Sequence, residues 1–301
     1  MRMLAALHRW WGVAFCPLFA MWFASGIVMH FVPFPARSEA GRVGGSATGG
    51  NSGIRSERDA LDLATAYTRE RRLDVSHATV GLIDYDQWTV AGEFDSDRPL
   101  YRITVNDDAG TELYVSSSTG DVVLLTTQNV RLANYIGSIA HWIYATALRH
   151  RRQTWTTLMW WLSLVATIGA SIGVIIGIVR PGRATAYRGL QRVHHTFGLI
   201  FAPFILCWIF SGFLSTWAGG LFDPVAMPIG LFRALHTFDV PPLASRPWLR
   251  SSLIVGLCLC GLAFSLTGVA LAWRRLWMSF AGPEEDPEGD FRTPPLLTAG
   301  W

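Results

Sequence analysis

The chain contains two pairs of histidines in repeated sequence contexts: His8 with His194, and His141 with His236. The first pair lies in Leu7–Gly12 and Val193–Gly198, which match at a spacing of 186 residues. The second pair is spaced by 95 residues. The same two spacings align further short motifs, namely Ser25-Gly26 with Ser211-Gly212 and Gly173-Val174 with Gly268-Val269. Matches at two fixed offsets indicate an internal repeat, in which equivalent histidines can share one role.

Two imidazoles at one membrane depth, on different helices, can bind the iron of a b-type haem (heme b) as axial ligands. Gly12 and Gly198 follow the first pair by four residues, on the same helical face, where a glycine leaves room for a macrocycle. Arg9 and Arg192 are close enough in sequence to neutralise haem propionates. The sequence therefore predicts two haem sites, an inner one on His8 and His194 and an outer one on His141 and His236.

Other histidines and a simpler explanation stay open. His30 is a backup ligand for the outer site and His195 for the inner site, whereas His77 and His150 have the character of surface residues. The simpler explanation is that histidines at a membrane interface hydrogen-bond to lipid headgroups. Ionisable groups at membrane depth are costly and usually functional, so we favour the haem hypothesis.

The elements that must position these histidines are hydrophobic helices. Half of the 301 residues are hydrophobic and only 16% are charged, which is low for a soluble protein. Four apolar stretches can each cross a hydrocarbon core about 30 Å thick. We expect the first to be an uncleaved anchor. The stretches are Trp10–Phe31, Trp155–Val179, Thr196–Ala218 and Ser251–Trp273.

Each repeat contains two spans, so both copies enter the membrane in the same direction and form a parallel two-helix duplication. Equivalent histidines then lie at equal depths. More arginines flank the 2–3 loop and the chain ends than the opposite side, which places both termini in the cytoplasm. The predicted organisation is transmembrane helix 1 (1–31), linker (32–53), soluble domain (54–130), outer histidine segment and helix 2 (131–179), Arg-rich loop (180–195), helix 3 (196–218), short outer segment (219–250), helix 4 (251–273) and cytoplasmic tail (274–301).

The segment from 54 to 130 predicts a small α+β domain. Fourteen acidic residues against seven arginines give it a net charge of −7, which indicates a compartment separate from the basic remainder of the chain. A helical pattern covers Ser56–Arg72, and strand-like runs follow at Trp88–Phe94, Leu100–Val105 and Leu113–Val115. No basic patch with interleaved aromatic residues occurs, so nucleic acid is not an expected partner.

The repeated motifs resemble those of the bacterial PepSY-associated transmembrane proteins. The likeness extends to about Arg275. In the acidic domain, Leu113–Val115 followed by Ser118–Val122 is similar to the strand-turn-strand signature of a PepSY domain. The motifs of the membrane part are Leu7–Gly12, Ser25-Gly26, Arg192–Gly198, Ser211-Gly212, Leu235–Thr237 and Thr267–Arg275.

That resemblance implies a bacterial inner-membrane protein with a periplasmic PepSY-like domain. Members of the family include ferric-siderophore reductases with two b-type haems, so it also implies electron transfer to a periplasmic ferric acceptor. One departure concerns the outer site, because the family's usual glycine shortly after the outer histidine is absent after both His141 and His236. No G-x-G-x-x-G occurs, so electrons are expected from a quinol or a separate reductase. The alternatives are a non-catalytic membrane anchor that binds a partner and, less favoured, a transporter.

Overall fold

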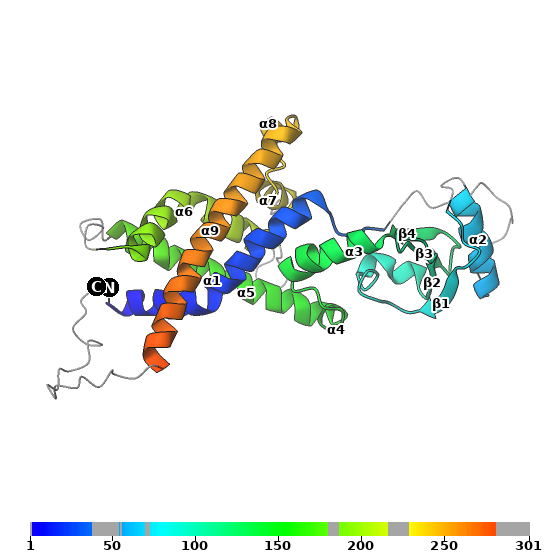
Figure 1. Ribbon diagram of the computed structural model, residues 1–301, viewed down its shortest axis with the longest axis horizontal. Helices are drawn as coiled ribbons and strands as arrows, with labels where there is room; N and C mark the ends of the chain where they lie inside the picture. The colour runs from blue at the N-terminus through cyan, green and yellow to red at the C-terminus, as the bar shows by residue number, and fades with distance from the viewer. Residues whose placement is uncertain are drawn as a thin grey trace. The chain divides into compact units, whose positions relative to one another are not determined.

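The computed structural model describes residues 2–37, 54, 56–69, 73–179, 187–215 and 229–280. Among them, four helices are long and apolar enough to cross a membrane. These helices are α1 (Arg2–Phe31), α5 (Arg152–Val179), α6 (Leu190–Ser215) and α9 (Pro247–Phe280). The four spans predicted from hydropathy are therefore present (Figure 1).

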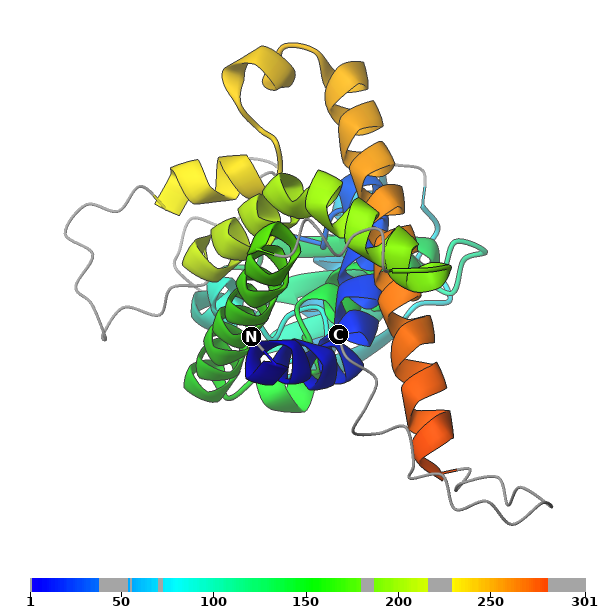
Figure 2. The ribbon, with the colours of Figure 1, turned by 90° about the vertical axis from the view of Figure 1, so that its left-hand side faces the viewer.

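All four helices begin before the predicted spans, and α9 continues to Phe280, inside the predicted cytoplasmic tail. We expected the cytoplasmic loop to reach residue 195, but α6 already begins at Leu190, so His194 and His195 belong to the helix. The prediction from hydropathy left out this first turn because it is polar, but a helix can continue past the apolar core of the bilayer. The predicted end of span three at 216–218 lies outside the described residues. Pro17 lies within α1, which changes direction along its length (Figures 1 and 2).

The chain divides into two compact units, residues 1–24 with 157–301, and residues 25–156. In the first unit, α6 packs against α9 and against α7 (Ile229–His236), which is followed by α8 (Pro241–Ala244). Small residues allow close helix approach here, as expected within a membrane. Gly261 of α9 lies against the ring of Phe23, and Gly177 of α5 against the side chain of Leu199.

The second unit contains a four-stranded antiparallel sheet in the order β1-β2-β3-β4. The strands are β1 (Thr79–Ile83), β2 (Leu100–Thr104), β3 (Glu112–Ser116) and β4 (Val122–Thr126). Helix α2 (Glu57–Arg69) begins after Ser56, whose hydroxyl accepts a hydrogen bond from the backbone N–H of Asp59. Its apolar stripe packs with one set of sheet residues, and this cluster contains Ala60, Ala64, Ile103, Leu113 and Val115. The predicted small α+β domain is thus present.

The expected strand at Trp88–Phe94 is wrong. The Asp86 carboxylate accepts hydrogen bonds from the backbone N–H groups of Trp88 and Thr89, which holds this segment in a turn. The 3₁₀-helix η1 (Gly92–Asp97) follows it. Trp88 and Phe94 instead pack in a second buried cluster with sheet residues, so their apolar character serves packing rather than strand pairing.

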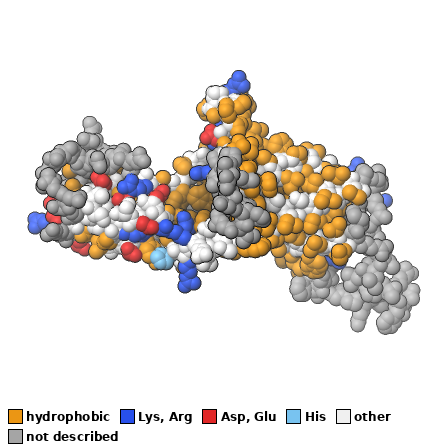
Figure 3. All heavy atoms as spheres, turned by 180° about the vertical axis from the view of Figure 1, so that it is seen from behind, with side chains coloured by type: hydrophobic (Ala, Val, Ile, Leu, Met, Phe, Trp, Pro, Cys, Tyr) orange, Lys and Arg blue, Asp and Glu red, His pale blue; other side chains and the backbone are white. Residues whose placement is uncertain are grey.

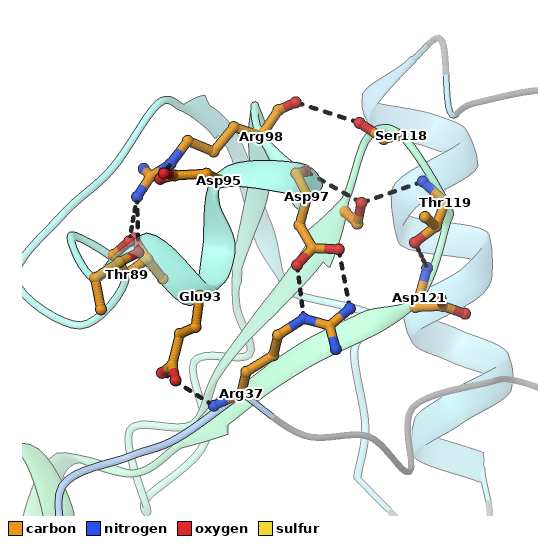
Figure 4. Close-up of polar contacts among 11 residues, drawn as sticks. Arg37, Thr89, Glu93, Asp95, Asp97, Arg98, Ser118, Thr119 and Asp121 are labelled. Carbon is orange, nitrogen blue, oxygen red and sulfur yellow. Dashed lines mark hydrogen bonds and ion pairs between the residues drawn. The ribbon is translucent and has the colours of Figure 1, made fainter. Parts of the chain in front are cut away.

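The chain just after α1 is attached to this sheet domain (Figure 4). Arg37 donates two hydrogen bonds to the Asp97 carboxylate, at 2.7 and 3.2 Å, and its backbone N–H donates to Glu93 at 3.4 Å. Asp97 is 1% exposed, so the guanidinium neutralises a buried charge. The remainder of the predicted linker, 38–53, lies outside the described residues.

The surfaces of the two units differ in character. On the face shown in Figure 3, hydrophobic side chains cover the helices, whereas acidic and basic side chains are scattered over the sheet domain. Large apolar side chains of the spans are exposed, including Ile168, Ile175, Ile200 and Leu259. Such a surface is stable when lipid surrounds it.

The sheet domain is followed by α3 (Gln128–Asn134) and a single π-helical turn, η2 (Tyr135–Ile139). The short helix α4 (Thr146–Arg149) then leads to α5. Gly137 of η2 lies against Val28 of α1, within the same unit. His141 therefore stands two residues after the end of a π-helical turn, a geometry that often occurs at functional positions.

Candidate functional site

His8 of α1 is held against α5. Its Nδ1 lies 3.3 Å from the carbonyl oxygen of Gly169. A backbone carbonyl can only accept a hydrogen bond, so Nδ1 carries the proton and the lone pair of the neutral ring is on Nε2. A Cβ at Gly173 would be 3.1 Å from both ring nitrogens of His8 and closer still to Cε1. The glycine is therefore required for this position of the imidazole.

His194 of α6 is held against α9 in the same way. Its Nδ1 lies 2.7 Å from Oγ1 of Thr267, and this hydroxyl donates its own hydrogen to the carbonyl of Phe264 at 2.6 Å. The threonine oxygen must then accept from Nδ1, which leaves the lone pair of His194 on Nε2. A Cβ at Gly268 would be 3.4 Å from Cε1 of His194 and would collide with Cys16.

Two aromatic rings fix the faces of these imidazoles. The ring of Phe264 stacks on His194, with centroids 4.5 Å apart and planes inclined by 17°. Trp11 stacks on His8, with centroids 5.9 Å apart and planes inclined by 16°. Trp11 also donates from Nε1 to the carbonyl of Val165 at 3.1 Å, one turn from the carbonyl that binds His8. The orientation of each ring is thus determined by a hydrogen bond and by packing together.

His236 ends α7 and is tied to α6. Its Nδ1 lies 3.0 Å from the carbonyl oxygen of Trp208 and 3.3 Å from the hydroxyl of Ser211. Burial lowers the pKa of His236, and the hydrogen bond to the Trp208 carbonyl acts in the opposite direction. The net effect favours the neutral ring, which is the form that binds a metal.

His141 has an equivalent serine contact. Its Nδ1 lies 3.0 Å from Oγ of Ser25, which is the serine of the first Ser-Gly motif. Ser25 belongs to α1 and is buried. Both outer histidines therefore meet a serine of the repeated motif at Nδ1, and each contact lies within a single unit.

The backbone turns that follow the two outer histidines are also equivalent. Ile143 and Phe238, two residues after His141 and His236, have left-handed φ values of 49° and 52°. In each case the left-handed residue donates to the carbonyl three positions earlier, and the next residue donates to the carbonyl five positions earlier. This is a Schellman closure, which normally has glycine at the left-handed position. This chain adopts the left-handed conformation at both positions with larger residues, Ile143 and Phe238.

The glycines that contact the histidines are not the ones predicted. A Cβ at Gly198 would lie 3.1 Å from the ring of Phe264, and one at Gly12 would face Cys16 of its own helix. Gly173 and Gly268 contact the imidazoles instead. The sequence signal for them was their shared position in the repeat, to which we had assigned no role.

The predicted arginines occupy different environments. Arg9 is partly buried, and its Nε finds no hydrogen-bond acceptor among the described residues. Its charge interacts with that of Arg275. Arg192 is exposed. Of the backup ligands, His30 contacts the ring of Phe31 edge-on, and His195 lies against Tyr187.

The structure places His8 and His194 in one unit, whereas His141 and His236 belong to different units. The pairing of the outer histidines therefore stays a prediction from the sequence. Within the described residues no three His, Cys, Asp or Glu side chains gather as they would around a bare metal ion. Axial ligation of haem requires only two side chains, so it does not need a cluster of three. In comparisons with known proteins, no family, no curated protein and no solved structure matches this chain.

Proposed function

We propose that this chain is a membrane electron carrier that binds b-type haem through His8 and His194 and delivers electrons to an acceptor outside the cytoplasm. The observation that carries the proposal is the hydrogen bonding of these two rings. Among the residues that the structure describes, His8 and His194 form their hydrogen bonds through Nδ1. This is the arrangement by which proteins orient a metal-binding imidazole and leave Nε2 for the metal.

The residues around the inner pair fit a haem in two further respects. Gly173 and Gly268 permit each ring to lie close to a neighbouring span. The buried Nε of Arg9, which lacks an acceptor among the described residues, suits the carboxylate of a propionate group.

When bound, haem supplies a one-electron carrier whose potential depends on its ligands and their hydrogen bonds. The residues of this chain do the rest. The carbonyl of Gly169 and the hydroxyl of Thr267 hold the Nδ1 protons of the two rings. Phe264 and Trp11 stack on the rings and restrict their orientation.

Equivalent contacts in the two copies support the parallel duplication. His8 lies against Gly173 as His194 lies against Gly268. Similarly, the serine of each Ser-Gly motif meets an outer histidine. A duplication of this kind favours a second haem at the outer pair, which the repeat assigns to His141 and His236.

The acceptor follows from the resemblance to PepSY-associated proteins. The antiparallel β3 and β4, joined by the Ser-Ser-Thr-Gly turn, agree with the strand-turn-strand signature of a PepSY domain. We propose that this domain lies in the periplasm of a bacterium, that the spans lie in the inner membrane with both chain ends in the cytoplasm, and that a ferric siderophore or similar ferric ligand is reduced. A quinol or separate reductase supplies the electrons.

The test is to purify the full chain from haem-sufficient cells and record its reduced-minus-oxidised spectrum, with pyridine haemochrome quantification. We expect b-type bands that decrease in His8→Ala and His194→Ala. His77→Ala, which changes a histidine of the sheet domain, is the control and should keep the full haem content. A colourless wild-type protein would contradict the proposal and favour the non-catalytic membrane anchor.

A further inference from the structure

We propose that Arg149 binds the phosphate group of an anionic phospholipid at the end of the chain's second span, where α5 begins. The inference goes beyond the proposed function and does not depend on whether haem is bound. Arg149 is the last residue of α4. All the side chains that carry the argument belong to the unit of residues 25–156 or follow it directly along α5.

Two aromatic rings hold the guanidinium of Arg149. Its Cζ lies 4.3 Å from the centroid of the Trp155 ring and 5.0 Å from that of Tyr144. The indole Nε1 of Trp155 donates a hydrogen bond to the carbonyl of Trp142 at 2.9 Å, and Tyr144 is 5% exposed. Both rings are therefore fixed by their own surroundings. They attract the cation through their faces and place it before any ligand arrives.

Arg149 lacks the carboxylate that comparable arginines have. Five arginines of this unit are partly buried among the described residues, and Arg149 is one of them. The other four each form an ion pair with Asp or Glu, and they are Arg37, Arg98, Arg102 and Arg131. The Nε of Arg149 is buried and has no acceptor within the described part of the chain. Because a buried donor without a partner is unfavourable, an acceptor from outside these residues is expected.

The position of Arg149 identifies the kind of acceptor. It lies three residues before α5, which is long and apolar enough to cross a membrane. Exposed apolar side chains of α5 begin at Leu158, one turn after Trp155. Trp and Tyr are enriched at the level of the lipid headgroups, where phosphate is the abundant anion. A planar guanidinium can donate two parallel hydrogen bonds to phosphate oxygens, which makes it well suited to this ligand.

The neighbouring charges favour a headgroup with a net negative charge. His150 and Arg151 are exposed beside Arg149. In the run from 149 to 152, only Arg152 pairs with a carboxylate of the described residues, that of Asp95. The run therefore keeps an excess of positive charge. Basic side chains near the membrane surface are attracted to anionic lipids, so phosphatidylglycerol should bind in preference to the zwitterionic phosphatidylcholine.

The experiment titrates the delipidated full chain in detergent with phosphatidylglycerol or phosphatidylcholine, and native mass spectrometry counts the bound lipids. We expect phosphatidylglycerol to bind more tightly than phosphatidylcholine. Arg149→Gln should lower the affinity for phosphatidylglycerol by about 10–100-fold, the effect of losing hydrogen bonds to a charged group. Arg246→Gln is the matched control, because Arg246 is exposed directly before α9 and no described side chain pairs with it or stacks on it. This variant should bind as wild type does.

Several results would overturn the inference. These are equal affinity of wild type and Arg149→Gln, an equal loss in Arg246→Gln, and equal binding of the two lipids. Inorganic phosphate is added to distinguish the sources of the anion: if it displaces phosphatidylglycerol at equal concentration, the site takes free phosphate and the lipid assignment is wrong. If Arg149→Gln does not fold, Arg149→Lys keeps the charge without the planar fork and should bind phosphatidylglycerol more weakly. Wild-type affinity in Arg149→Lys refutes recognition by the guanidinium.

Discussion

Gly173 gives the sharpest test of the inner site. In Gly173→Ala, the new Cβ would stand 3.1 Å from both ring nitrogens of His8 and closer to Cε1. Because favourable contacts between such atoms begin at about 3.5 Å, the imidazole has to move by on the order of 1 Å. That movement breaks or lengthens the 3.3 Å contact between Nδ1 and the carbonyl of Gly169.

The magnitude follows from two effects. Overpacking of an interior typically costs about 1–3 kcal/mol, and loss of the hydrogen bond adds about 0.5–1.5 kcal/mol. For the cofactor, displacement of an oriented ligand is expected to lower haem affinity by about 10–100-fold. We therefore expect Gly173→Ala to lose the inner haem first, with a smaller effect on the thermal stability of the helices.

The assay is haem stoichiometry by pyridine haemochrome, together with thermal unfolding followed by circular dichroism. Gly256→Ala is the matched control, because this glycine of α9 has no atom within 4 Å of its added Cβ, apart from its own helix. The control should hold haem as wild type does. Full haem content and an unchanged spectrum in Gly173→Ala would refute the placement of His8 against α5.

Three further outcomes are expected. Gly268→Ala should lower the free energy of unfolding by about 1–3 kcal/mol through collision with Cys16. Adding Cys16→Ala should restore most of the lost unfolding free energy. A double-mutant cycle measures this, and strictly additive losses would disprove the contact. Arg37→Ala should cost about 1.5–3 kcal/mol, since it leaves the buried Asp97 carboxylate without its ion pair; urea unfolding measures this, and an unchanged midpoint would contradict it. For Asp107, burial raises the pKa, but hydrogen bonds from the threonine four residues later outweigh it, so the folded pKa is lowered. The stabilisation that Asp107 contributes is present above the unfolded pKa of about 3.9 and is lost as the pH falls through the folded pKa. Asp107→Asn should therefore be less stable than wild type at pH 7, and the difference in unfolding free energy should disappear on acidification. A difference that does not depend on pH would refute the assignment.

The membrane part could be predicted from the sequence because lipid imposes a simple requirement. A spanning segment must be long, apolar and internally hydrogen-bonded, and the four predicted stretches satisfy this. Helix ends were harder, because polar first turns such as that of α6 continue beyond the apolar stretch. The soluble strands were harder again. β1 was missed, and Trp88–Phe94 was mistaken for a strand, because apolar residues that cover a sheet resemble those that form one.

The candidate site was predictable as far as the repeat reached. Two spacings identified the histidines, yet they gave no information on what each ring touches. Every residue type has a backbone carbonyl, so no sequence pattern can mark the carbonyl of Gly169 as the partner of His8. Gly173 and Gly268 were visible as repeated positions, but their importance depends on the distance between neighbouring spans. Contacts between helices are therefore the part that required the structure.

The carbonyl partner of His8 also bears on proton movement. Histidine can relay a proton by taking one up on one ring nitrogen and releasing another from the opposite nitrogen. A backbone carbonyl cannot return a proton to Nδ1, so the tautomer of His8 stays fixed while the contact to Gly169 persists. His8 then forms no step of a proton wire, and a chain that carries electrons past it can do so without leaking protons through this residue.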